Sequence, residues 1–203
     1  MAGIVEKKII FGLGTGRCGT MSLANLLNFQ EDCLMTHELG GLPWLSWKVN
    51  EREFQYFFKK VLNRKELFVG DVSLYSLPYW KNILKFNSES KFVIIKRDKN
   101  ETISSYMKKT SGQNPFMEHD GSRWKHYEWD RCYPKMNCAN KETAISLYYD
   151  YYYELCKEIP KDKAFWISTS DLNVEDKCFE MLKFCGFQNP RFKIFKKNEG
   201  DKK

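Results

Sequence analysis

The sequence has no uninterrupted hydrophobic stretch approaching the ~20 residues that a helix needs to cross a bilayer. Its opening residues, MAGIVEKKIIFGLG, form an apolar segment that is too short and too interrupted by glycine for a secretory signal peptide. We therefore expect no transmembrane segment and a cytoplasmic location.

Cysteine pairs at metal-binding or redox spacing are also missing. The seven cysteines include no CxxC pair, and their number is odd. A disulfide framework or a zinc ribbon is therefore not expected, and thiols without a secretion signal are ordinarily reduced. We predict no metal site.

The composition excludes a disordered or fibrous chain. The 203 residues are 42% hydrophobic, 16% aromatic and 29% charged, which is enough apolar surface to build a core. This length predicts a single domain over residues 1–203. The net charge of +7 suits an anionic ligand, but charge alone does not indicate nucleic acid, and no nucleic-acid partner is expected.

Apolar segments of strand length alternate with segments of helical periodicity. This order indicates parallel β-α-β units, and hence an α/β fold in which a central parallel sheet forms the middle layer of a three-layer α/β/α sandwich. Residues 110–140 have no clear period and are predicted to form a lid or substrate loop, and residues 196–203 a frayed tail. The predicted strands are 8–13, 33–36, 67–70, 91–96, 164–168 and 191–195, and the predicted helices are 19–29, 51–62, 77–86, 100–109, 141–158 and 174–185.

The most informative segment is the glycine-rich turn in IIFGLGTGRCGTMSL, between the first strand and the first helix. Backbone N–H groups in such a turn, with the positive end of a helix behind them, form a site for an anion. The glycines let the backbone approach the ligand, and Thr20 and Ser22 add hydroxyl groups. The sequence therefore predicts a phosphate-binding loop.

Two common nucleotide motifs match this turn only in part. Gly14, Gly16 and Gly19 have the spacing of the dinucleotide fingerprint, but no second strand with a clear acidic end follows about 20 residues later. The spacing also fits a Walker A loop, but Thr20 occupies the lysine position and the cation lies inside the loop, at Arg17. A nucleotide-dependent phosphotransferase and a non-catalytic nucleotide-binding module remain as alternatives.

GTGRCGTMSL resembles the 5′-phosphosulfate loop of the sulfotransferases that use 3′-phosphoadenosine 5′-phosphosulfate (PAPS). The resemblance implies a P-loop-like fold of the bacterial or glycan-modifying type, PAPS as donor, 3′-phosphoadenosine 5′-phosphate (PAP) as product, and no metal. The residues that it implies for the 5′-phosphosulfate are Gly16, Arg17, Cys18, Gly19, Thr20, Met21 and Ser22.

A second segment, KFVIIKRDKNETISSYM, resembles the 3′-phosphate motif of the same family. Arg97 ends a buried strand, Asp98 follows, and Ser105 lies eight residues after the arginine, although Lys99 replaces the usual proline. An arginine fork with a hydroxyl group suits a dianionic phosphate. The resemblance therefore implies that Arg97 and Ser105 hold the 3′-phosphate.

Sulfuryl transfer to a hydroxyl or amine needs a cation at the leaving phosphate and a base for the acceptor's proton. The resemblance implies Arg17 as the cation. Two places compete for the base: Asp71, which closes the strand 67–70, and the pair His37 and Glu38, with Glu38 lying 21 residues after Arg17. We favour Asp71, with His37 and Glu38 supporting it or contacting the acceptor.

The segment RWKHYEWDRCYPK concentrates aromatic and polar side chains. Such a mixture suits a small-molecule, glycan or lipid acceptor with hydroxyl groups. Trp124, His126 and Trp129 are predicted to contact that acceptor.

Overall fold

The computed structural model of the chain describes residues 6–38, 42–109, 127–138 and 140–195. Within these residues five strands form one sheet, in the order β2-β3-β1-β4-β5, and every neighbouring pair is parallel. The elements are β1 (Lys8–Leu13), α1 (Thr20–Asn28), β2 (Cys33–His37), α2 (Glu51–Leu62), β3 (Phe68–Val72), a 3-10 turn (Leu77–Tyr79), α3 (Trp80–Phe86), β4 (Lys91–Lys96), α4 (Lys99–Lys109), α5 (Tyr127–Cys132), α6 (Lys141–Cys156), β5 (Ala164–Ser168), a second 3-10 turn (Asp171–Asn173) and α7 (Glu175–Phe184).

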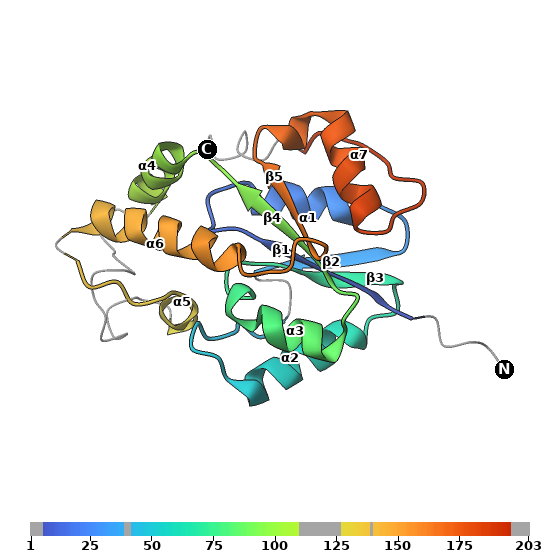
Figure 1. The fold of residues 1–203 in the computed structure, drawn as a ribbon, viewed down its shortest axis with the longest axis horizontal. Coiled ribbons are helices and arrows are strands. Elements are labelled where there is room, and N and C mark those ends of the chain that lie inside the picture. The colour runs from blue at the N-terminus through green and yellow to red at the C-terminus, as the bar shows by residue number, and fades with distance from the viewer. Residues whose placement is uncertain (1–5, 39–41, 110–126, 139, 196–203) are drawn as a thin grey trace, which may run out of the picture.

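Helices cover both faces of the sheet. α1 and α7 lie on one side, and α2, α3 and α6 lie on the other (Figure 1). Strands covered on both faces are apolar almost throughout, and β4 accordingly buries each residue between its first and last. The predicted three-layer α/β/α sandwich with a central parallel sheet is confirmed.

The carboxyl ends of the parallel strands bring together segments that are far apart in sequence. The turn after β1 lies centrally, because β1 pairs with β3 on one side and with β4 on the other. Ligands of open α/β sheets bind at this edge, where the strand order reverses. Asp71 in β3, the residue after β2 and the residue after β4 therefore surround the predicted phosphate loop.

The predicted strand at 191–195 is wrong. These residues pack on α1 and the turn after it instead of extending the sheet: Arg191 N donates to Gln30 Oε1 at 2.9 Å, and the Phe195 ring contacts Phe29 edge to face. The backbone is thus bonded to side chains of the helix layer. The apolar side chains Phe192 and Phe195 pack against that layer, on Phe179 and Phe29 respectively.

The segment predicted to be a loop contains a helix, α5, that periodicity did not indicate. Residues 110–126 and 139 of that segment, and the tail 196–203, lie outside the described residues. All seven cysteines are free thiols, five of them buried. No helix of the described chain is long and apolar enough to cross a membrane.

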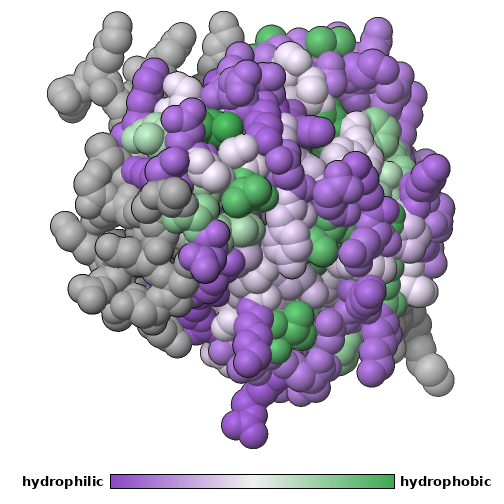
Figure 2. Space-filling view, turned by 60° about the vertical axis from the view of Figure 1, so that its left-hand side comes forward, coloured by the Kyte–Doolittle hydropathy of each residue, from purple (hydrophilic) through white to green (hydrophobic). Residues whose placement is uncertain are grey.

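Turning the molecule so that the left-hand side of Figure 1 comes forward shows a largely hydrophilic surface (Figure 2). Hydrophobic residues occur on this face as small patches with hydrophilic residues between them.

Candidate functional site

The turn after β1 has an unusual backbone. Gly16, Arg17 and Gly19 have φ angles of 81°, 57° and 97°, all in the left-handed region. A Cβ atom on Gly16 would lie 2.5 Å from Tyr106 Oη, so both the backbone angle and the space require glycine there. Arg17 has a side chain, which makes the same region cost about 1–2 kcal/mol. The surrounding contacts therefore hold the loop in a fixed shape.

The first turn of α1 presents the positive end of the helix to this loop. Gly19 precedes the helix, no acidic residue lies in the first turn, and no side chain of the described residues caps it. Thr20 Oγ1 lies 2.9 Å from His37 Nε2, and Ser22 Oγ donates to Phe195 O at 2.9 Å. The uncapped end suits an anion.

Two predicted parts of the loop have structural partners. Gly14 N donates to the hydroxyl of Tyr152 at 2.9 Å, so this N–H group is engaged inside the protein. The Cys18 side chain is fully buried, and burial raises the pKa of its thiol to about 11. Cys18 is thus a protonated packing residue at neutral pH, and only its backbone can serve a ligand.

The two predicted phosphate sites lie side by side. Arg17 Nε donates to Ser105 Oγ at 3.0 Å, and Arg97 Nη1 donates to Arg17 O at 3.2 Å. Arg97 Nε also pairs with Glu101 at 2.8 Å. Residues 80 or more positions apart in sequence therefore form one cationic cluster with a hydroxyl group, in which Ser105 bonds to Arg17.

Asp71 is completely buried. The Thr36 hydroxyl donates to Asp71 Oδ1, while Asp71 Oδ2 has no hydrogen-bond partner in the described part of the chain. Burial raises the pKa of this carboxyl, and the Thr36 hydroxyl and the Arg64 charge partly oppose the rise. The Asp71 side chain therefore has no solvent-exposed surface.

Glu38, the residue after β2, is close enough to Asp71 and Arg17 for both charges to affect its pKa. It is only partly buried, its φ is 43°, and its backbone oxygen accepts the Tyr75 hydroxyl at 3.1 Å. Burial raises the pKa of Glu38 to about 7; the charge of Asp71 adds to the rise, and Arg17 opposes it. Glu38 is therefore a carboxyl group that changes its charge near neutral pH.

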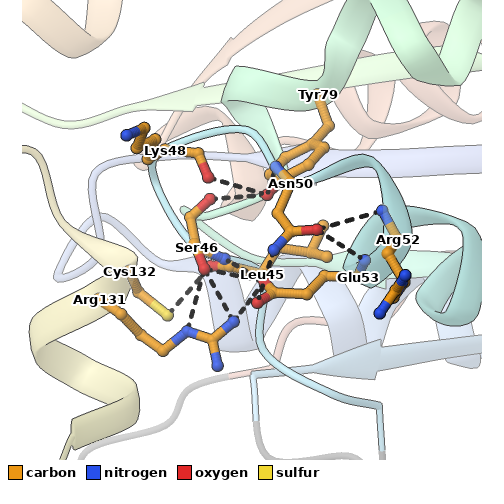
Figure 3. A network of polar contacts seen from close by, with 9 residues as sticks. All are labelled: Leu45, Ser46, Lys48, Asn50, Arg52, Glu53, Tyr79, Arg131 and Cys132. Atoms are coloured by element: carbon orange, nitrogen blue, oxygen red, sulfur yellow. Dashed lines mark hydrogen bonds and ion pairs between the residues drawn. The ribbon is translucent and has the colours of Figure 1, made fainter.

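The predicted acceptor contacts are not all described. Trp124 and His126 lie outside the described residues, and only the backbone of Trp129, in α5, is described. α5 itself is fixed by polar contacts that sequence reasoning missed. Arg131 pairs with Glu53 and donates to Ser46 Oγ at 2.8 Å (Figure 3).

Comparison with known proteins gives a result for structure only: no protein-family model and no curated protein matches the chain. A sulfotransferase from Alicyclobacillus acidocaldarius is similar in structure, with a TM-score of 0.61 and 13% identity over 97% of this chain and 87% of that chain. Mouse sulfotransferase SULT7A1, crystallised with PAP, has a TM-score of 0.52 and 10% identity over 93% of this chain and 62% of that chain.

The fold is thus that of α/β proteins with a phosphate loop after the first strand. Within that class it is the sulfotransferase fold.

Proposed function

We propose that the protein is a PAPS-dependent sulfotransferase. The observation that carries the proposal is the cluster of Arg17, Arg97 and Ser105, which two separate motifs supply to one edge of the sheet. The similar fold of a mouse sulfotransferase crystallised with PAP supports this ligand. A single phosphate site would need only one of the two motifs.

PAPS is a substrate of this reaction, and the residues present fit its two charged ends. We assign the 5′-phosphosulfate to Arg17, to the backbone of residues 16–22 and to the uncapped start of α1. We assign the 3′-phosphate to Arg97 and Ser105. The bonds that these side chains make to one another without ligand would be exchanged for stronger charge-assisted bonds to phosphate oxygens.

The reaction moves a sulfuryl group to an acceptor oxygen or nitrogen. The acceptor atom forms a bond to sulfur, the bond from sulfur to the phosphate oxygen breaks, and PAP leaves with the electron pair. Arg17 is assigned the role of stabilising the negative charge that develops on the leaving phosphate. The acceptor's proton must pass to a base within hydrogen-bond reach.

We assign that base to Glu38 in preference to Asp71, which the sequence favoured. A base with a pKa near the working pH transfers protons most efficiently, and the pKa of Glu38 is about 7. Asp71 has no exposed surface through which an acceptor can reach it. Its negative charge instead helps to keep the pKa of Glu38 high.

The acceptor is proposed to be a small molecule, glycan or lipid with a hydroxyl or amino group, and the protein is proposed to act in the cytoplasm. The Trp44 ring stacks on Tyr75 with centroids 5.8 Å apart, and Tyr75 in turn holds Glu38. Tyr75 is buried, but Trp44 is only partly buried, and an aromatic ring beside the proposed base supports an acceptor with a flat or cyclic body.

Thermal unfolding with three ligands tests the proposal. PAP without metal should raise the melting temperature in proportion to RT ln(1 + [L]/Kd), while ATP with Mg²⁺ and a short RNA should not. Stabilisation by ATP with Mg²⁺ alone would indicate a phosphotransferase, and by RNA alone a binding module. Transfer of ³⁵S from labelled PAPS to panels of glycans, lipids and phenols would then identify the acceptor.

A further inference from the structure

Four tyrosines of α6 lie on one face of that helix. Tyr148, Tyr149, Tyr152 and Tyr153 are at most 5% exposed, whereas Tyr151 is 44% exposed. Their spacing places them on two successive turns that face the sheet, beside α4 (Figure 1). Each of the four hydroxyl groups forms a hydrogen bond with a backbone group at the carboxyl edge of the sheet.

Two of these tyrosines hold the phosphate loop. Tyr148 donates to Thr15 O at 3.1 Å, and Tyr106 of α4 donates to the same oxygen. Tyr152 accepts the Gly14 N–H at 2.9 Å and donates to Leu74 O at 3.3 Å, which links the loop after β1 to the loop after β3.

The other two hold the end of β4. Tyr153 donates to Ile95 O at 2.8 Å, and Tyr149 donates to Arg97 O at 2.6 Å. The backbone of the residue assigned to the 3′-phosphate is therefore fixed by the same helix face as the 5′ loop.

A loop that turns its N–H groups toward an anion leaves buried carbonyl oxygens on its other side. Buried carbonyl groups need donors, and Thr15 is fully buried. Tyrosine hydroxyls supply these donors on rigid rings that are themselves packed in the core. One helix, α6, therefore contacts the backbone of both proposed phosphate sites.

We propose that the α6 tyrosines are positioning residues for the donor: Tyr148 and Tyr152 for the 5′-phosphosulfate loop, and Tyr149 for Arg97. This inference rests on the proposed function, because it assigns the two ends of the ligand to these positions. It predicts that substitution of Tyr149 and substitution of Tyr152 affect the binding of different parts of the ligand.

Tyr149→Phe and Tyr152→Phe test the inference by calorimetry with PAP and with 5′-AMP, which lacks the 3′-phosphate. In Tyr149→Phe, loss of the bond to Arg97 O should weaken PAP binding about fivefold and leave 5′-AMP binding nearly unchanged. Tyr152→Phe should weaken the binding of both ligands about equally. Tyr151→Phe, on the exposed side of the same helix, is the matched control and should change neither.

Equal losses for both ligands in Tyr149→Phe, or no loss in either variant, would overturn the positioning role. Amide hydrogen exchange supplies a readout that needs no ligand. Residues 14–19 should exchange faster in Tyr152→Phe than in Tyr151→Phe, because Gly14 N–H loses its acceptor. Unchanged exchange would overturn the inference even if PAP binds. An exchange difference between the two variants, together with a wild-type protein that binds no PAP, would overturn the proposed function instead.

Discussion

The cations and the carboxylates of the site differ in how far they are buried, most clearly between Arg17 and Asp71. Arg17 is exposed and the Arg97 side chain is 32% exposed, whereas Asp71 is fully buried and Glu38 partly buried. Exposed cations stay hydrated and ready for an anion, while burial keeps carboxyl groups from ionising easily. In the proposed reaction, one edge of the sheet thus provides a permanent positive charge for the donor and an adjustable negative charge for the acceptor.

Glu38→Gln should have the largest effect on the carboxylate side. The amide keeps the shape and loses the basicity, so kcat should fall by about 10²–10⁴-fold, the usual contribution of a general base. PAP affinity should change little, because the proposed donor contacts remain. Steady-state kinetics with saturating PAPS measures the first effect and calorimetry the second.

Glu180→Gln, at a surface ion pair on α7, is the matched control and should leave kcat unchanged. Near-normal turnover in Glu38→Gln combined with a dead Asp71→Asn variant would return the base to Asp71. Normal turnover in both would mean an acceptor acidic enough to need no base.

The pH dependence of kcat should follow Glu38. A base acts only when ionised, so a carboxyl with a pKa of about 7 gives a rate that is flat above that pH. Below it the rate should fall about tenfold per pH unit, as one proton binds. A profile that stays flat down to pH 5 would contradict the assignment of Glu38.

Asp71→Asn should produce a smaller change, visible mainly in that profile. The charge of Asp71 contributes to the high pKa of Glu38, so its removal should move the midpoint of the profile to lower pH. At neutral pH a larger share of Glu38 would then be ionised. An unchanged midpoint would mean that the two carboxyl groups are not coupled.

His37→Gln should have the smallest effect. Glutamine keeps a polar group at this position, where His37 Nε2 lies 2.9 Å from Thr20 Oγ1, and a typical hydrogen bond is worth about 1 kcal/mol. We expect a change in kcat below about fivefold, the equivalent of that energy. A loss as large as that of Glu38→Gln would show that His37 itself handles the proton.

Much of the fold was predictable because both faces of the sheet are covered. The continuous apolar runs at 8–13, 91–96 and 164–168 became strands with those bounds. The exceptions depend on distant contacts. α5 is held by Glu53 and Ser46, and 191–195 packs on α1, and neither partner lies within a local window of sequence.

The proximity of the cationic side chains was predictable for a similar reason. Arg17, Arg97 and Ser105 follow strand ends at fixed spacing, and parallel strands bring such ends together. The carboxylate half was not, because the exposure of Glu38 and Asp71 depends on what covers them. The tyrosine run YYDYYY gave a partial signal: the spacing of Tyr148, Tyr149, Tyr152 and Tyr153 is that of one helix face.

Calorimetry of PAP against 5′-AMP, in wild-type protein and in Arg97→Ala, tests the central claim most directly. The wild type should prefer PAP by about 10- to 100-fold, the effect of charge-assisted hydrogen bonds to the 3′-phosphate, and the preference should disappear in Arg97→Ala. Arg191→Ala, at an exposed ion pair with Glu31 beyond the C-terminal end of α1, should keep it. Equal affinity for PAP and 5′-AMP in the wild type, or a preference that survives Arg97→Ala, would contradict the account.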